Sequence, residues 1–157
     1  MWAAPSQSSM DPMLMTGSDP IDAERAFTRS IRQRRRAAVL RLLRRRGAGS
    51  DRLPVFDDRD LARSGGSHGT REIPLCAIRG TVEPSRAAMF DEAFRPRPAA
   101  RTRWQRVWVA EQRGQALPPI SVARVGDAYA VRDGHHRVSV ARARGAITID
   151  ATVDAAA

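Results

Sequence analysis

Residues 119–149 read PISVARVGDAYAVRDGHHRVSVARARGAITI, and this stretch decides the fold. The apolar residues in 120–125 and 128–132 predict two strands, and Gly126-Asp127 between them predicts a tight turn, so the strands should form a hairpin. A helical pattern follows over 135–144 and stops at Gly145. Residues 147–153 then predict a last strand.

The remaining elements of the same domain are predicted upstream of this stretch. The domain should begin near Arg71 with a strand over 72–79, which Gly80 ends. A short helix is expected over 86–94, before the prolines of 95–98, and a stronger helix over 100–113. Residues 71–157 are therefore predicted to form a small α+β domain with a mixed sheet and helices.

Aromatic and cysteine residues indicate what lies inside this domain. Trp104 and Trp108 are one helical turn apart and have arginines beside them. They suit either a base-stacking face or the core, and the core is favoured because the chain has few aromatic residues. Cys76 is the only cysteine, which excludes an internal disulfide and suits a cytoplasmic setting. Its apolar surroundings predict a buried thiol.

Positive charge is concentrated near the N-terminus. The chain has a net charge of +10 and no lysine, and residues 25–46 contain ten arginines and no acid. Residues 1–18 are predicted to be disordered, 19–47 to form a basic amphipathic helix that starts at Asp19, and 48–70 to be a linker. An apolar stripe along the helix comprises Phe27, Ile31, Ala38 and Leu42.

One face of this basic helix carries Arg25, Arg29, Arg32 and Arg36. Such a stripe can bind DNA phosphates without reading sequence. A solvated or docked helix, a helix on anionic lipid and an arm for an acidic protein remain alternatives. No stretch approaches the ~18 apolar residues of a membrane span.

The turn Asp133-Gly134-His135-His136-Arg137 carries the clearest functional signal. It leads from a strand into a helix, so unpaired N–H groups and the positive end of the helix dipole lie beside two imidazoles and a guanidinium. This combination predicts a phosphate site, most plausibly for a nucleotide. The alternatives are a plain Asp-Gly turn with a histidine cap, or a zinc site using His68, which the absence of a cysteine cluster disfavours.

The order of elements around this turn resembles the ParB/sulfiredoxin-like fold over residues 72–153. ParB partition proteins carry Gly-Glu-Arg-Arg at the corresponding turn, where it grips the triphosphate of CTP. Sulfiredoxins carry Gly-Cys-His-Arg, and free-serine kinases of this fold carry the most similar form, Asp-Gly-His-Xaa-Arg. His135 stands in place of the sulfiredoxin cysteine, so sulfinic acid reduction is not expected.

The resemblance implies a nucleotide, ATP, ADP or CTP, with or without Mg²⁺. Gly134, His136 and Arg137 are the positions implied to contact phosphate, with His135 beside them. Asp133 is implied to orient the loop or help hold magnesium, and Ser139 to donate to a phosphate. The resemblance also favours DNA as the partner of the basic helix in a bacterial protein, and it leaves a homodimer open.

An enzyme is the competing interpretation. In the kinase branch of this fold a carboxylate after the first strand acts as a base, and Glu83 occupies the comparable place. A metal-dependent nuclease would need a carboxylate cluster, which the scattered acids do not show. We therefore expect a nucleotide-binding module that binds DNA non-specifically, with a small-molecule kinase or nuclease as the alternative.

Overall fold

The structure, a computed structural model, describes residues 17–44, 50–57, 59–61 and 69–154. Four α-helices and a five-stranded mixed sheet confirm the predicted α+β class. In chain order the elements are α1 (Asp19–Arg44), β1 (Thr70–Pro74), the 3-10 turn η2 (Leu75–Ala77), β2 (Ile78–Thr81), α2 (Pro84–Ala87), η3 (Pro98–Ala100), α3 (Arg101–Gln112), β3 (Ile120–Val125), β4 (Ala128–Asp133), α4 (His135–Ala143) and β5 (Thr148–Asp154).

The sheet has the order β1-β5-β3-β4-β2. β3 and β4 are antiparallel neighbours joined at Gly126, so the predicted hairpin is confirmed. α4 leads from β4 to β5, which lies on the other side of β3 and runs parallel to it. The start of α4 is therefore fixed at the end of a central strand.

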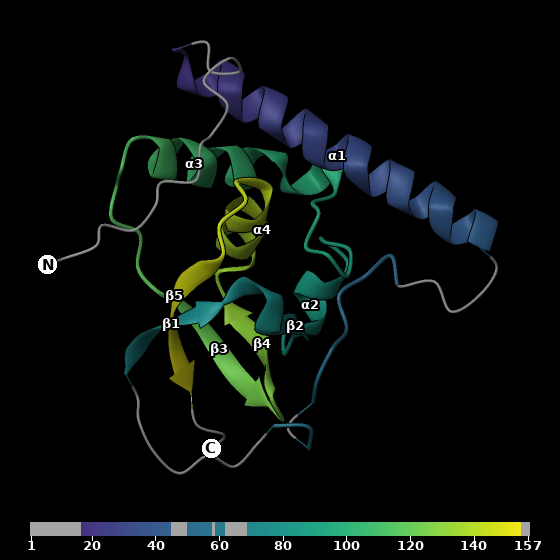
Figure 1. The fold of residues 1–157 in the computed structure, drawn as a ribbon, viewed down its shortest axis with the longest axis vertical. Coiled ribbons are helices and arrows are strands. Elements are labelled where there is room, and N and C mark those ends of the chain that lie inside the picture. The colour runs from purple at the N-terminus through teal and green to yellow at the C-terminus, as the bar shows by residue number, and fades with distance from the viewer. Residues whose placement is uncertain (1–16, 45–49, 58, 62–68, 155–157) are drawn as a thin grey trace, which may run out of the picture.

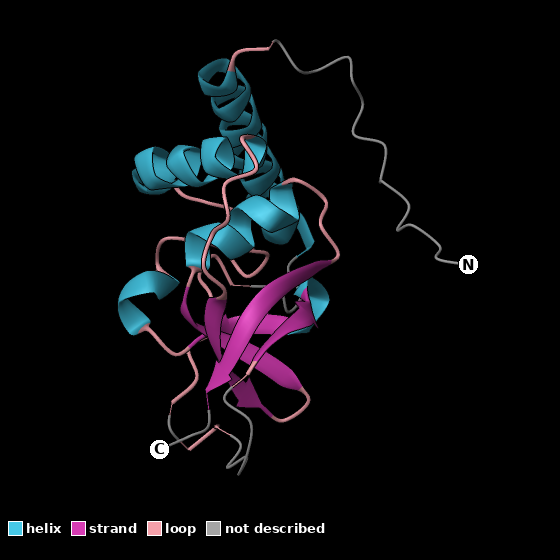
Figure 2. Ribbon diagram, turned by 90° about the vertical axis from the view of Figure 1, so that its left-hand side faces the viewer, coloured by secondary structure: helices cyan, strands magenta, loops and turns pink. Residues whose placement is uncertain are grey.

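The helices lie in succession above the sheet (Figures 1 and 2). Val138 of α4 packs into the core that includes the sheet residues. Val140 packs into a second core between α1, α3 and α4, where Phe27 and Trp104 meet edge to face. α4 is consequently buried on two sides, and both tryptophans of α3 are in the core, as favoured from the sequence.

The predicted strand over 72–79 is wrong, because the chain bends in its middle. β1 lies at one edge of the sheet and β2 at the other, with η2 between them. The Arg142 guanidinium holds this bend by donating to the carbonyls of Leu75 (2.9 Å) and Ile78 (2.8 Å). Cys76 lies on the bend and is exposed, so the prediction of a buried thiol is also wrong.

The predicted helix over 86–94 is wrong in extent, since α2 ends at Ala87. The buried Asp91 carboxylate accepts hydrogen bonds from the amides of Ala93 (3.1 Å) and Arg95 (2.8 Å). A side chain that bonds nearby amides competes with helix formation. Phe94 has a positive φ of 59° in this loop.

α1 is packed along its first half only. Phe27 is fully buried, and Arg34 donates to Asp51 and to the carbonyl of Arg95. Beyond Arg34 the helix runs past the end of α3 (Figure 1). Leu42 is 79% exposed there, so the predicted apolar stripe is buried only over its N-terminal part.

The predicted linker packs against the domain where the structure describes it. Leu53 is buried, and Val55 pairs with Thr81 beside β2. Residues 1–16, 45–49 and 62–68 lie outside the described residues, and with them the predicted N-terminal disorder and the end of the basic helix. No helix in the described part of the chain has the length and apolar character needed to cross a membrane.

Candidate functional site

The turn before α4 has the backbone geometry that its sequence predicts. Gly134 caps the helix in a left-handed conformation, with φ 100° and ψ 20°, and no side chain caps the helix start. A Cβ at Gly134 would lie 2.4 Å from Cγ2 of Ile120, so only glycine fits here. The amides of the first helical turn thus face away from the strand without a side-chain acceptor, as an anion site requires.

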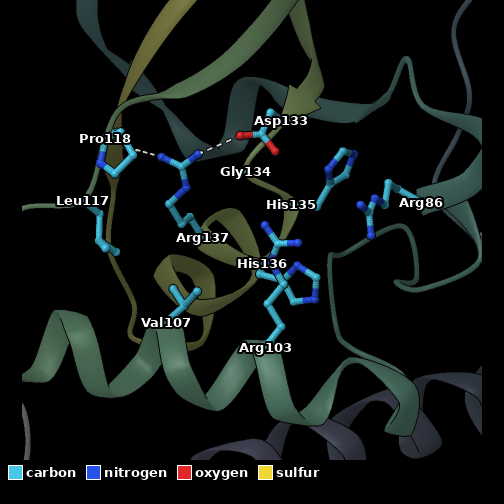
Figure 3. Close-up of a pocket in the computed structure, with 10 residues that line it drawn as sticks. All are labelled: Arg86, Arg103, Val107, Leu117, Pro118, Asp133, Gly134, His135, His136 and Arg137. Carbon is cyan, nitrogen blue, oxygen red and sulfur yellow. Dashed lines mark hydrogen bonds and ion pairs between the residues drawn. The ribbon is translucent and has the colours of Figure 1, made fainter.

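A cleft of about 250 Å³ opens at this helix start. Side chains from three helices and two loops converge on it (Figure 3). Three arginines and one carboxylate give it a positive charge. The lining residues are Arg86, Arg103, Val107, Leu117, Pro118, Asp133, Gly134, His135, His136 and Arg137.

His136 is the most informative residue of the cleft. Its side chain packs against the edge of Phe90 and the residue is only 7% exposed. Its Nε2 atom is buried and has no hydrogen-bond partner. Burial, followed by the charges of Arg103 and Arg86, lowers the pKa of His136 to about 4. An unpaired buried polar atom is costly, so this imidazole is suited to a ligand that the protein alone does not provide.

His135 has a structural partner instead. Its Nε2 atom lies 2.7 Å from Oγ1 of Thr81, at the end of β2. Burial, followed by the charge of Arg86, lowers the pKa of His135 to about 4 as well. Of the two adjacent imidazoles, therefore, one joins the turn to the sheet and the other is left without a partner.

Arg137 and Asp133 hold the turn together. The Arg137 guanidinium donates to the carbonyl of Pro118 and to Oδ2 of Asp133, the latter at 3.2 Å. Burial lowers the pKa of Arg137, and Asp133 opposes this effect. Arg137 therefore ties the 117–118 loop to the turn while it lines the cleft. Asp133 has the loop-orienting role, one of the two that the resemblance implies.

A protein-held magnesium ion does not fit this cleft. Among its lining residues Asp133 is the single carboxylate, and it is paired with Arg137. Within the described residues no three His, Cys, Asp or Glu side chains are grouped so that they could hold a metal ion. His68, the third residue of the disfavoured zinc reading, lies outside them.

Two predicted site residues do not line the cleft. Ser139 is buried on another side of α4, where its Oγ accepts a hydrogen bond of 2.9 Å from Nε1 of Trp104. Glu83 is half-buried at the start of α2, and its amide donates to Oγ1 of Thr81. Glu83 precedes Arg86 by one helical turn, and it is Arg86 that reaches the cleft.

Arg86 and Arg103 were missed as site residues by sequence reasoning. Each lies on a helix that precedes the turn by more than 30 residues, and nothing in its local pattern sets it apart from the other arginines. The pair forms the side of the cleft opposite Arg137 (Figure 3). Only the packing of α2 and α3 around α4 brings these charges to the turn.

The predicted arginine stripe of α1 forms a separate surface. Arg25, Arg29, Arg32 and Arg36 are all exposed and line a shallow groove together with Glu24, Thr28 and Gln33. This groove lies on the face of α1 that does not contact α3.

Comparisons of the chain with models of protein families, with curated proteins and with solved structures find no match. The geometry of the cleft and of α1 therefore has to carry the functional argument.

Proposed function

We propose that this protein is a nucleotide-binding module that holds the phosphates of its ligand in the cleft at the start of α4. The observation that carries the proposal is the buried, unpartnered Nε2 of His136 inside a cleft lined by three arginines. A cation would be repelled there, and an uncharged ligand would leave the guanidinium charges without counter-charge.

A phosphate suits the donors of this cleft. The first amides of α4 point outward at the positive end of the helix dipole, and anions bind such helix starts readily. Arg86 and Arg103 add guanidinium donors from the opposite side. In this proposal they contact phosphate oxygens directly, while Arg137 keeps the loop in place.

The other side of the cleft favours a ligand larger than free phosphate. Val107, Leu117 and Pro118 line the cleft on the side where Arg137 lies, away from Arg86 (Figure 3). Ligand sites commonly combine an apolar wall with a few placed polar groups. A nucleotide has this character, with phosphates for the arginines and a base or sugar for the apolar wall. The implied ATP, ADP and CTP are therefore the ligands to test.

The resemblance to the ParB/sulfiredoxin-like fold supports the same proposal through the Asp133–Arg137 turn. The kinase and nuclease alternatives receive less support. Glu83 is not a lining residue, and the described residues show no carboxylate cluster. We therefore propose binding without assigning a reaction.

A titration with matched variants tests nucleotide binding. Wild-type protein should bind at least one of ATP, ADP and CTP, and Arg86→Ala, Arg103→Ala and the double variant His136→Ala/Arg137→Ala should each weaken binding tenfold or more. Arg106→Ala is the control, because Arg106 is an exposed arginine of α3 outside the cleft. Equal weakening by the control, or no binding by wild-type protein, would contradict the proposal. Product analysis of the bound nucleotide then distinguishes a module from an enzyme.

We propose a second function for the exposed arginine stripe of α1, non-specific binding to DNA. The supporting observation is that all four arginines lie on one solvent-facing groove. Phosphate neutralisation makes such binding strongly salt-dependent, with a slope of about −0.9 per phosphate in log K against log salt concentration. Replacing Arg25, Arg29, Arg32 and Arg36 by Gln should reduce this slope by up to about four contacts.

The DNA experiment needs a control for lost charge. Replacing four exposed arginines elsewhere, namely Arg71, Arg79, Arg106 and Arg124, removes the same charge without touching α1. Equal loss in both quadruple variants would show that net charge alone attracts DNA, and an unchanged slope in the α1 variant would remove α1 as the contact. Both variants should still bind the nucleotide.

A further inference from the structure

We propose that an anionic ligand enters the cleft together with a proton, which His136 takes up at Nε2. This inference rests on the proposed phosphate site and adds to it a regulation by pH. It assigns different tasks to the two histidines of one motif.

The surroundings of His136 make its charge depend on the ligand. Arg86 from α2 and Arg103 from α3 lie on its side of the cleft (Figure 3), and both disfavour an imidazolium there. From its own turn, the charged and titratable neighbours are Asp133, His135 and Arg137. Phe90 covers the edge of the ring and offers no hydrogen-bond acceptor. In the empty cleft the ring is therefore neutral at neutral pH, with its pKa lowered to about 4.

A bound dianion reverses each of these effects. It supplies an acceptor for the N–H of Nε2, which has none in the protein. It also compensates the charges of Arg86 and Arg103, and an opposite charge within hydrogen-bond distance favours the charged form of a base. The pKa of His136 must rise when the ligand binds, so binding and protonation strengthen each other.

His135 does not share this role because of its contact with Thr81. The Thr81 hydroxyl already satisfies its Nε2 atom at 2.7 Å, within a buried group of hydrogen bonds. A ligand in the cleft would have to displace this contact to reach the same atom. The proton uptake is therefore assigned to His136 alone.

Inorganic sulfate is the probe for this inference, since it remains doubly charged throughout the pH range in which an unperturbed histidine titrates, about pH 5 to pH 8. Sulfate affinity of the wild-type protein should rise at least about tenfold from pH 8 to pH 5, and at most about tenfold for each pH unit. In His136→Gln, which keeps an N–H donor but takes up no proton, the affinity should be nearly independent of pH. His135→Gln should keep most of the wild-type dependence.

Two measurements on the unmodified protein guard against variants that fold poorly. Calorimetry in two buffers of different ionisation enthalpy should show net proton uptake on sulfate binding at pH 6. NMR of the imidazole nitrogens should show that sulfate raises the pKa of His136 above its value in the free protein. Binding with no proton uptake, or a pH dependence that persists in His136→Gln, would overturn this inference and leave the phosphate site standing. Absence of sulfate and nucleotide binding at every pH would overturn both.

Discussion

The imidazole of His135 and the hydroxyl of Thr81 are 2.7 Å apart and join the start of α4 to the end of β2. Thr81 is fully buried, and its Oγ1 also lies 3.0 Å from the carbonyl of Val131 and accepts a 2.8 Å hydrogen bond from the amide of Glu83. One hydroxyl thus connects two strands, α2 and the predicted phosphate turn. This contact separates the structural histidine from its free neighbour.

Replacing Thr81 by Val should destabilise the fold, because it leaves the Glu83 amide and the His135 imidazole without their partner. Each unsatisfied buried group costs about 1–3 kcal/mol, so the free energy of unfolding should fall by at least about 2 kcal/mol. Urea unfolding measures this change. Thr102→Val, at an exposed position on α3, is the matched control and should change the free energy by about 0.5 kcal/mol or less. Comparable effects of both substitutions would contradict the role assigned to Thr81.

Gly134→Ala should damage both the fold and the cleft. The added Cβ meets Ile120 at 2.4 Å, and the φ of 100° strains any side chain. Gly126→Ala provides a control, since Gly126 also has a positive φ, 56°, but nothing lies within 4 Å of the added Cβ. We expect Gly126→Ala to cost about 1 kcal/mol and Gly134→Ala clearly more, with loss of anion binding only in the latter. Circular dichroism and a sulfate titration provide the two readouts.

The sequence was most predictive where signals are local. The hairpin, α4 and the left-handed glycine at residue 134 follow from strand patterns and turn residues within a few positions of one another. The phosphate turn belongs to this group, since its amides, imidazoles and guanidinium all come from five consecutive residues. That they bind an anion remains a prediction.

Features created by distant contacts were not predictable in this way. The chain bends at Leu75 because Arg142, 67 residues later, bonds the carbonyl there, and this contact separates β1 from β2 and exposes Cys76. Likewise, Arg103 reaches the cleft only because α3 crosses α4. Local periodicity contains no information on such pairings.

The two halves of α1 should differ sharply in their contribution to stability. Phe27→Ala removes a fully buried ring that contacts Trp104 and should cost about 3–5 kcal/mol. Leu42→Ala acts on a side chain that is 79% exposed and should change the free energy of unfolding by about 0.5 kcal/mol or less. Thermal and urea unfolding of both variants test this division. A large loss in Leu42→Ala would show that the outer half of α1 also packs in solution.

Stability should fall on acidification, and the two histidines define the pH window. Their pKa values are about 4 in the folded protein and about 6.5 when unfolded. The unfolded chain therefore binds more protons between these values, so the stability present above about pH 6.5 is lost progressively as the pH falls towards 4. The upper limit is roughly 3 kcal/mol per imidazole. Urea unfolding at pH 7.5 and pH 5, in buffers without phosphate or sulfate, measures the loss, and His136→Gln should reduce it by about half. Added sulfate should reduce the loss in wild-type protein but not in His136→Gln, because a bound anion raises the pKa of His136 in the folded state.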